Sequence, residues 1–170
     1  MFMIPTGSHS LWQGFDLDVR RELWFGIGDI FHLHGDNGSG KTSFLRKLLV
    51  PQALDSVNPV YQLYFEQQSA LQLFSVKAYA ALQKPPRQIN NENQMIDYLL
   101  DSFDLARQRE ARPALVMIDE SPRLHDIIER VSVHSVCIVF ASHQSVIPGA
   151  RRICFKTVRQ GLSEVDAEHD

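Results

Sequence analysis

The sequence has no long apolar run, little cysteine and no excess of positive charge, and each absence excludes a class of protein. No apolar stretch approaches the roughly 18 residues that a membrane-spanning helix needs. The two cysteines, Cys137 and Cys154, lie in the apolar runs VCIVFA and ICFK, where a buried free thiol is favoured over a disulfide or half of a metal site. With 17 Lys and Arg against 20 Asp and Glu, the formal net charge is −3, so the chain lacks the basic surface that binds nucleic acid or anionic membranes.

Features that would target or divide the chain are also missing. The first ten residues, MFMIPTGSHS, lack the basic start and apolar stretch of a secretory signal. The 170 residues contain no repeat, low-complexity tract or linker. We therefore expect one cytoplasmic domain, residues 1–170, that is long enough to bury a real core and that reaches a membrane only through a partner.

What is present is an alternation of apolar strands with helical segments. Apolar residues at positions 15, 17, 19, 23, 25 and 27 keep a period of two that only Arg21 breaks. This pattern predicts one long bent strand or a tight strand pair in an N-terminal β layer. The segment IFHLH predicts a strand. TSFLRKLLV predicts a helix that has its apolar side chains on one face and ends before Pro51.

The rest of the chain extends this pattern. VYQLYFEQQ, PALVMIDE and CIVFASH predict strands, residues 91–110 predict a helix with asparagines available as caps, and LHDIIERV predicts a short helix. RRICFKTVRQGLSEV predicts a closing strand pair, or a strand and a turn. Apolar strands separated by helices indicate a parallel sheet with helical cover.

A glycine-rich run, GDNGSGKT at residues 35–42, lies between the first predicted strand and helix and matches the phosphate-binding loop G-x-x-x-x-G-K-[ST]. Its glycines let the backbone wrap closely enough for successive N–H groups to point at a phosphate. Lys41 would reach the β- and γ-phosphate oxygens, and the Thr42 hydroxyl would ligate Mg²⁺. The residues predicted to contact a nucleotide here are Gly35, Asp36, Asn37, Gly38, Ser39, Gly40, Lys41, Thr42 and Ser43.

Two acids end the apolar strand ALVMIDE, residues 114–120. In an open α/β sheet, ligands bind at the edge formed by the carboxyl ends of the strands. Asp119 at that edge can hold Mg²⁺ through water, and Glu120 can orient or deprotonate an attacking water. The plainer alternative is that both acids merely leave the core for solvent.

Together these motifs resemble the ATP-binding cassette (ABC) ATPases. GDNGSGKT followed by SFLRKLL is similar to the family's phosphate loop and first helix, MIDE to its Walker B segment, and FASHQ to the strand that ends in its switch histidine. The resemblance implies an α/β P-loop NTPase fold, a three-layer sandwich with a mostly parallel core sheet, an N-terminal antiparallel β layer and a reduced helical subdomain. It also implies ATP and Mg²⁺ as cofactors and ATP hydrolysis as the activity.

The resemblance assigns roles to residues at matching positions. Glu120 would polarise the attacking water, and His143 would sense the γ-phosphate. With Lys41 they form the expected catalytic set. The eight residues DESPRLHD match the length of the segment that leads into the family's D-loop, which places Asp126 on the D-loop aspartate.

Two further nucleotide contacts follow from the resemblance. Trp12 sits where the family carries an aromatic that stacks on adenine, with Phe15 as the reserve candidate. Gln67 or Gln68 resembles the Q-loop glutamine that contacts the metal's water. The candidate metal ligands are therefore Thr42, Asp119, Gln67 and Gln68. The plainer alternatives are a surface loop for the glutamines and simple packing for the tryptophan.

One motif of the family is missing. The glycine-rich LSGGQ-like signature is absent, and its place reads QINNENQ, residues 88–94. Asn90, Asn91 and Asn93 could cap a helix there and donate to phosphate, but no glycine permits the usual close backbone approach. We therefore expect a pared-down cassette whose dimerisation or turnover is weakened or altered.

A pair of histidines lies outside these motifs. His32 and His34 are two apart on a strand and so face the same way, a spacing that suits a metal. No third ligand is evident nearby, so we favour a partly buried structural pair.

Three functions are open at this point. The first is an ATPase in which Mg·ATP brings two copies together, or joins the chain to a heteromeric partner such as a membrane transporter subunit or a soluble assembly. The second is a regulatory module that binds nucleotide with little hydrolysis, which the missing signature motivates. The third is a small P-loop phosphotransferase, whose lid arginines would have to come from Arg107, Arg109 and Arg112.

Overall fold

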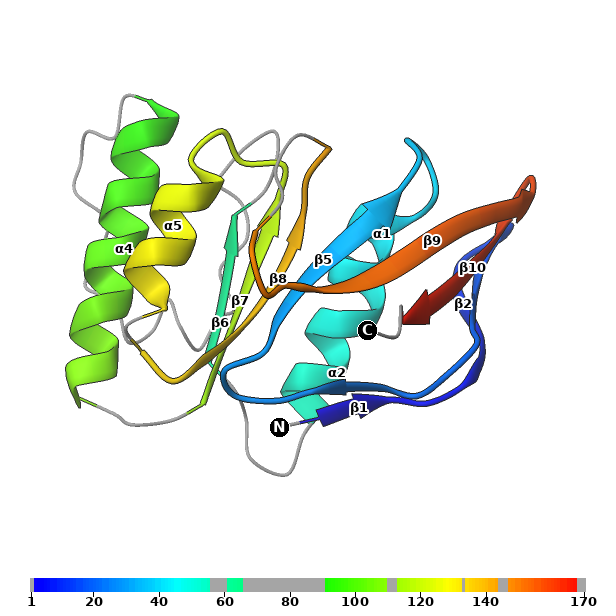
Figure 1. The fold of residues 1–170 in the computed structure, drawn as a ribbon, viewed down its shortest axis with the longest axis horizontal. Helices are drawn as coiled ribbons and strands as arrows, with labels where there is room; N and C mark the ends of the chain where they lie inside the picture. Colours follow the sequence, from blue (N-terminus) through cyan, green and yellow to red (C-terminus); the bar gives the residue numbers. More distant parts are fainter. Residues whose placement is uncertain are drawn as a thin grey trace.

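The computed structural model of the protein is an α/β structure with strands at its centre and helices on two sides (Figure 1). It describes residues 2–55, 61–65, 91–109, 113–132, 134–143 and 147–167. Most strand pairings in the large sheet are parallel, which confirms the predicted α/β class and the mostly parallel sheet.

Within the described residues, eight strands form one curled sheet in the order β2-β3-β10-β9-β5-β8-β7-β6. Its parallel core consists of β5 (Ile30–Gly35), β6 (Tyr61–Phe65), β7 (Ala114–Asp119) and β8 (Val136–Ala141). Because these strands run in the same direction, their carboxyl ends meet at one edge of the sheet. That edge carries the residues predicted to form the site.

The remaining strands of the sheet extend it beyond β5. β9 (Arg151–Arg159) runs parallel to β5, and β10 (Leu162–Ala167) turns back antiparallel to β9, which confirms the predicted strand pair. β10 also runs parallel to β3 (Phe15–Val19), and β2 (Gly7–Trp12) pairs antiparallel with β3.

The strands expected at residues 15–27 pair differently from the prediction. They form neither one bent strand nor a strand pair: β3 belongs to the large sheet, whereas β4 (Leu23–Phe25) pairs with β1 (Phe2–Ile4) in a separate antiparallel sheet. The period of two persists across both strands because each buries alternate side chains, such as Leu17 and Val19 in β3. Alternation reports which face of a strand is buried, and it carries no information on the partner strand.

The helix after the phosphate loop runs through Pro51, so the prediction that it ends there is wrong. The helix comprises α1 (Lys41–Ser43), the π-helical segment η1 (Phe44–Leu49) and α2 (Val50–Asp55) without interruption. Proline lacks the N–H that an α-helix uses in its regular hydrogen bonds. Pro51 is the second residue of α2, where the hydrogen-bond spacing changes from π- to α-helical, so the missing donor falls where the regular ladder is already broken.

The two other predicted helices are confirmed. α4 (Glu92–Arg109) begins where the Asn91 side chain accepts a hydrogen bond from the backbone N–H of Gln94 at 2.9 Å, the contact of an N-cap. α5 (Leu124–Val131) coincides with the segment LHDIIERV. Figure 1 shows α4 and α5 together beside β6, β7 and β8, away from α1 and α2.

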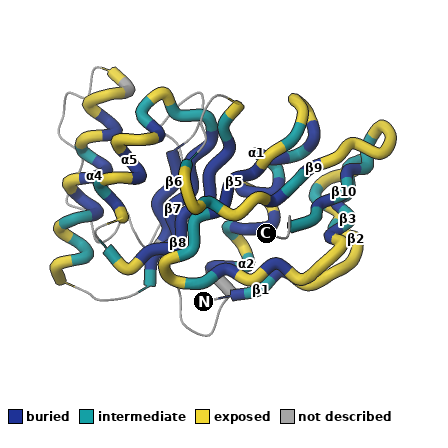
Figure 2. The backbone as a smooth tube through the Cα atoms, in the orientation of Figure 1, coloured by how far each residue is buried: buried dark blue, intermediate teal, exposed yellow. Residues whose placement is uncertain are grey.

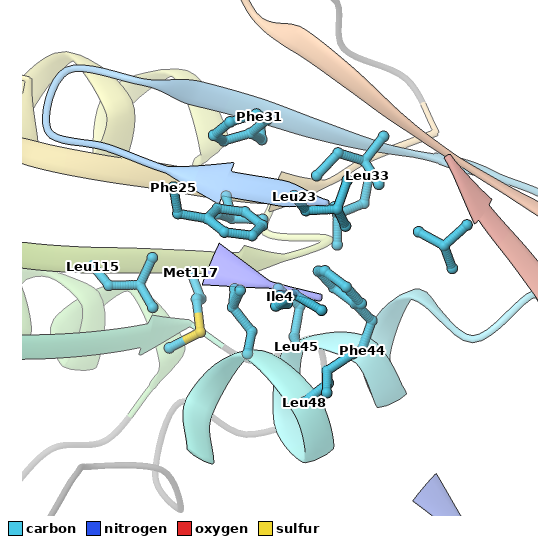
Figure 3. Packing of buried hydrophobic residues seen from close by; sticks show 14 of the residues in the cluster. Ile4, Leu23, Phe25, Phe31, Leu33, Phe44, Leu45, Leu48, Leu115 and Met117 are labelled. Atoms are coloured by element: carbon cyan, nitrogen blue, oxygen red, sulfur yellow. The ribbon is translucent and has the colours of Figure 1, made fainter. Parts of the chain in front are cut away.

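Two hydrophobic cores lie on opposite faces of the parallel strands. On one face, Leu115 and Met117 of β7 belong to a cluster with Phe44 and Leu45 of η1 (Figure 3). The intervening Val116 belongs to a second cluster, which includes buried residues of α4 and α5. Figure 2 accordingly shows the central strands as buried and the outer turns of α4 as exposed. Helices therefore cover both faces of these strands.

In both the cysteine pair and the histidine pair, one residue is buried and the other is more exposed. Cys137 on β8 is buried, which raises the pKa of its thiol to about 12, whereas Cys154 on β9 is only half-buried; neither forms a disulfide. His32 is buried and His34 is exposed, and their rings meet edge to face with centroids 5.8 Å apart, which agrees with the predicted, partly buried pair. No cluster of three His, Cys, Asp or Glu side chains suited to a metal occurs among the described residues.

The helices within the described ranges include none that is both long and apolar enough to cross a membrane.

Candidate functional site

The phosphate loop predicted from the sequence connects the end of β5 to the start of α1. Gly40, the N-cap residue of α1, has a φ of 101°, and a Cβ there would lie 2.8 Å from Cζ of Phe15. At Gly35, φ is 153° and a Cβ would lie 2.4 Å from the carbonyl oxygen of Phe155. Both positions combine a left-handed backbone with a contact too close for a side chain, so the loop requires glycine at each.

Lys41 lies inside the loop. Its ammonium donates to the carbonyl oxygens of Gly35 at 2.7 Å and Asp36 at 2.9 Å, and the residue is buried. Burial lowers the pKa of Lys41, and the carboxylates of Glu120, Asp119 and Asp36 oppose that shift. The loop therefore holds a positive charge next to the acids at the end of β7.

Ser39 carries a buried hydroxyl with no hydrogen-bond partner among the described residues. Its backbone N–H donates to the Asp36 carbonyl at 3.2 Å within the loop. A buried polar group without a partner is unfavourable, and in native structures it often marks the place of an ion or a ligand. Ser39, Gly35 and Asp36 shape the loop and are not among the residues that line the cleft described below.

Asp119 and Thr42, two of the predicted metal ligands, are brought into contact. Asp119 is buried at the end of β7, and its carboxylate accepts hydrogen bonds from the Thr42 hydroxyl and, at 3.3 Å, from the Tyr64 hydroxyl. Burial raises the pKa of Asp119, and these two hydrogen bonds lower it. Gln67 and Gln68, the other candidate ligands, lie outside the described residues.

Glu120 has an unusual backbone conformation and lies beside His143. With a φ of 52°, it is the only residue other than glycine with a positive φ in the described part of the chain. Its N–H donates to the Ala141 carbonyl at 3.0 Å, and its Oε1 lies 2.9 Å from Nε2 of His143. Strained residues of this kind persist where the surrounding structure holds them, and they gather at functional sites.

A cleft gathers most of the predicted residues. It has a volume of about 490 Å³, and its lining comes from the ends of β2 and β3, the phosphate loop with α1, and the residues that follow β7 and β8. The lining residues are Trp12, Phe15, Asn37, Gly38, Gly40, Lys41, Thr42, Ser43, Glu120 and His143. The phosphate loop and the predicted catalytic set therefore share one site.

Trp12 and Phe15, the two alternative adenine-stacking residues, form a stacked pair at this cleft. Their ring centroids lie 4.7 Å apart, with 14° between the ring planes. Trp12 is 46% exposed, whereas Phe15 is half-buried and packs toward Gly40. The pair presents an exposed indole that is backed by a phenyl ring.

The expected D-loop aspartate lies away from the cleft. Asp126 is exposed on α5, and its carboxylate forms an ion pair with Arg123. Arg123 also pairs with Asp97 of α4 at 2.7 Å. In this structure Asp126 therefore belongs to the contact between α5 and α4.

The residues considered for a phosphotransferase lid or a substitute signature supply no group to the cleft in the described ranges. Arg107 and Arg109 lie in the last turn of α4, outside the cleft lining. Asn91 caps α4. Arg112 and Asn90 lie outside the described residues.

Sequence reasoning missed Tyr64 and assigned no site contact to His32. In the strand YQLYF, Tyr64 fits the pattern of apolar core residues. Only its hydroxyl group could have indicated a contact with the site. His32 was recognised as one of a pair, but the structure pairs its Nε2 with the backbone carbonyl of Ser142 at 2.9 Å. A backbone acceptor leaves no mark in a sequence pattern.

The cleft combines four chemical capacities. The loop and Lys41 offer N–H groups and an ammonium for an anion. Thr42, with the buried Asp119 that contacts it but does not line the cleft, offers oxygens for a hard cation. Glu120 with His143 can move a proton, and Trp12 can stack on a planar group. No protein-family model matches this chain, and no curated protein matches it. Its function is therefore inferred from the residues of the cleft.

Proposed function

We propose that the chain binds Mg·ATP in this cleft and hydrolyses it, as its resemblance to the ABC ATPases implies. The observation that carries the proposal is that the phosphate loop and the Glu120–His143 pair line the same cleft. The mostly parallel sheet with helices on both faces supports a P-loop NTPase sandwich with a reduced helical subdomain as the finer description of the fold.

The phosphates would lie against the loop. The N–H groups of the loop and of the first turn of α1 favour negative charge there. The loop offers room at Gly38, where a Cβ would meet no atom within 4 Å. Lys41 would exchange its two carbonyl partners for phosphate oxygens, which accept stronger, charge-assisted hydrogen bonds. The Ser39 hydroxyl is buried within the loop, beneath the cleft lining, and has no partner in the described ranges.

The base would stack on Trp12, whose indole is exposed at the cleft. The cleft volume of about 490 Å³ lies within the range of about 300–1,000 Å³ that small-molecule sites occupy. Stacking on an aromatic ring accepts every base, because each has a π face. We therefore expect this contact to discriminate little between ATP and GTP.

The oxygens around Asp119 fit Mg²⁺. This ion prefers oxygen ligands, keeps several waters and is usually held by one or two protein oxygens together with substrate phosphates. Thr42 and Asp119 are already in contact with each other, and these two residues would hold the ion. Bound Mg²⁺ would neutralise charge on the phosphate oxygens as it develops.

Glu120 would act as the general base. Its carboxylate lines the cleft and can take a proton from a water that attacks the terminal phosphate. His143 orients that carboxylate through its contact with Oε1. The bond from the Glu120 N–H to Ala141 fixes the backbone from which the side chain enters the cleft.

The hydrolysis cycle would be passed on to a second chain. In the family that this protein resembles, Mg·ATP joins two copies or two different subunits, and a partner such as a membrane transporter subunit or a soluble assembly converts the cycle into work. Within the described part of residues 88–94, Asn91 is engaged as a helix cap and Asn93 is exposed. Of the two described asparagines there, Asn93 is therefore the one whose side chain could meet a nucleotide held by a second copy.

The test is the rate of Mg·ATP hydrolysis as the protein concentration is raised, for wild type, Lys41→Ala and Glu120→Gln. We expect the specific activity to rise with concentration and each substitution to reduce it by about 100-fold or more, the usual effect of losing a general base or a phosphate clamp. Lys47→Ala changes an exposed lysine of η1 and should retain activity. ATP binding without turnover above that of Glu120→Gln would contradict the ATPase and favour the regulatory module.

A further inference from the structure

A buried histidine lies on β5, the strand that leads into the phosphate loop, and faces β8, the strand that leads to His143. His32 is on β5, three residues before Gly35, and is 6% exposed. In the sheet it lies directly opposite Phe140 of β8. The two rings are stacked, with centroids 4.7 Å apart and 7° between their planes. This packing holds the imidazole in one orientation.

The imidazole has a defined hydrogen bond in that orientation. Its Nε2 lies 2.9 Å from the carbonyl oxygen of Ser142. Burial lowers the pKa of His32, and electrostatic repulsion from His34, Arg152 and His143 lowers it further, whereas the bond to Ser142 raises it. The ring is therefore neutral near pH 7. Because a carbonyl only accepts, the single ring proton sits on Nε2 and is donated to Ser142.

The acceptor of this bond is the peptide group that joins Ser142 to His143. The preceding carbonyl, that of Ala141, accepts the N–H of Glu120 at 3.0 Å. Two successive carbonyls at the end of β8 are thus held, one by the proposed general base and one by His32. His143 leaves the sheet immediately after them and places Nε2 at 2.9 Å from Oε1 of Glu120.

We propose that His32 is a positioning residue, which fixes the end of β8 through Ser142 so that His143 reaches the carboxylate of Glu120. The inference rests on the proposed ATPase function, and it adds a residue outside the cleft to that machinery. It also connects the phosphate loop to the proton-transfer pair, because His32 and Gly35 belong to the same strand. A histidine that only fills the core would stabilise the fold without affecting His143.

Three substitutions separate positioning from packing. His32→Phe keeps an aromatic ring against Phe140 and removes the donor. His32→Gln places an amide N–H near the position of Nε2, whereas the shorter His32→Asn places it near Nδ1, out of reach of Ser142. His34→Phe changes the exposed neighbour on the same strand, keeps an aromatic ring at the edge of the His32 ring and serves as the control.

The first readout is the steady-state kinetics of Mg·ATP hydrolysis. We expect His32→Phe and His32→Asn to lower kcat by about 10-fold, as for a lost buried hydrogen bond, while KM stays within about two-fold because the phosphate loop is intact. His32→Gln should recover at least half of the wild-type kcat, and His34→Phe should match wild type. If the His32→Phe protein does not fold, the difference in kcat between His32→Gln and His32→Asn tests the same hydrogen bond.

The second readout does not depend on turnover. In the nucleotide-free protein, Glu120→Gln should shift the imidazole ¹⁵N resonance of His143, and this shift should fall by more than half in the His32→Phe background. A wild type without ATPase activity would contradict the proposed function, and this measurement would still decide the role of His32. Unchanged kcat together with an unchanged shift, or equal damage from Gln and Phe, would overturn the positioning role.

Discussion

At the scale of single residues, Tyr64 holds Asp119, one of the two proposed Mg²⁺ ligands. Its hydroxyl donates to Asp119 at 3.3 Å, and burial, reinforced by the Asp119 charge, raises the pKa of Tyr64 so that the phenol stays protonated. Without this donor, the Asp119 carboxylate is free to turn away from Thr42. We expect Tyr64→Phe to weaken ATP binding by about 3–10-fold in Mg²⁺, the effect of one lost hydrogen bond, and to leave binding in EDTA unchanged.

Calorimetric titration with ATP in the two buffers measures this difference. Tyr98→Phe, on α4 and remote from Asp119, is the matched control and should bind ATP as wild type does in both buffers. An equal loss of affinity with and without Mg²⁺ would show that Tyr64 supports the loop or the fold instead of the metal ligand.

The buried imidazole of His32 makes stability depend on pH. Its pKa in the folded protein is lowered, chiefly by burial, whereas in the unfolded chain it stays near about 6.5. Below about pH 6.5 the unfolded state therefore binds more protons than the folded state, and folding stability falls as the pH falls. The positive charges that face His32 come from His34 on the same strand, Arg152 on β9 and His143 after β8.

His32→Gln removes this titration. We expect the free energy of unfolding of wild type, relative to His32→Gln, to decrease between pH 7.5 and pH 5.5, by at most about 1.4 kcal/mol for each pH unit below the unfolded pKa. Urea unfolding at the two pH values gives the difference. A difference that is constant or that grows toward acid would show that His32 accepts its proton readily in the folded state.

The phosphate-loop residues could be predicted because the spacing G-x-x-x-x-G-K-[ST] follows from the geometry of a backbone wrapped around a phosphate. The left-handed backbones of Gly35 and Gly40 satisfy that requirement. Glu120 and His143 could be located because each lies within two residues of the end of a wholly buried strand that is rich in apolar residues. The bond from His32 to the Ser142 carbonyl could not, because its acceptor is a backbone atom.

At the scale of elements, α4 and α5 are joined by ion pairs as well as by apolar contacts. Arg130 of α5 pairs with Asp101 and, at 2.8 Å, with Asp104 of α4, and His134 reaches the same Asp104 at 2.9 Å. The Arg130 side chain is 35% exposed, so water screens these pairs. We expect Arg130→Met to cost about 1 kcal/mol or less in low salt.

Thermal unfolding of Arg130→Met at low and high salt measures this contribution. Because salt screens partly exposed charges, the difference from wild type should shrink at high salt. Lys47→Met, which changes an exposed lysine on η1 with no ion pair in the described ranges, should show no such salt dependence. A loss of ATP affinity in Arg130→Met would contradict the assignment of this contact to structure alone.

Elements with a continuous or periodic apolar pattern were predictable, and elements without one were not. All six residues of β7 are buried, and α5 buries Leu124, Ile127, Ile128 and Val131 at helical spacing. The sequence therefore predicts both the strand and the helix. β1 has three residues, and β2, with the sequence GSHSLW, is mostly exposed, so neither carries a hydrophobic pattern. The helix end predicted at Pro51 was wrong because the rule that proline ends an α-helix takes no account of the π-helical segment that precedes it.

At the scale of the whole molecule, the order of strands depends on contacts between distant parts of the chain. β10 inserts between β9 and β3, and its Val165 lies opposite Val19. Both residues are buried, and both strands alternate between buried and half-buried side chains. Many other strand pairings would bury Val165 and Val19 equally well. The α/β class therefore follows from the sequence of elements, whereas the curled sheet and the separate β1–β4 pair required the structure.

The central claim is that the cleft binds Mg·ATP through its phosphate loop, and calorimetric titration of the protein with Mg·ATP tests it most directly. We predict one nucleotide bound per chain, with affinity at least about 10-fold weaker for Lys41→Ala, which loses the charge-assisted contact, and unchanged for Lys47→Ala. The absence of binding at millimolar Mg·ATP, or equal affinity of wild type and Lys41→Ala, would contradict the account.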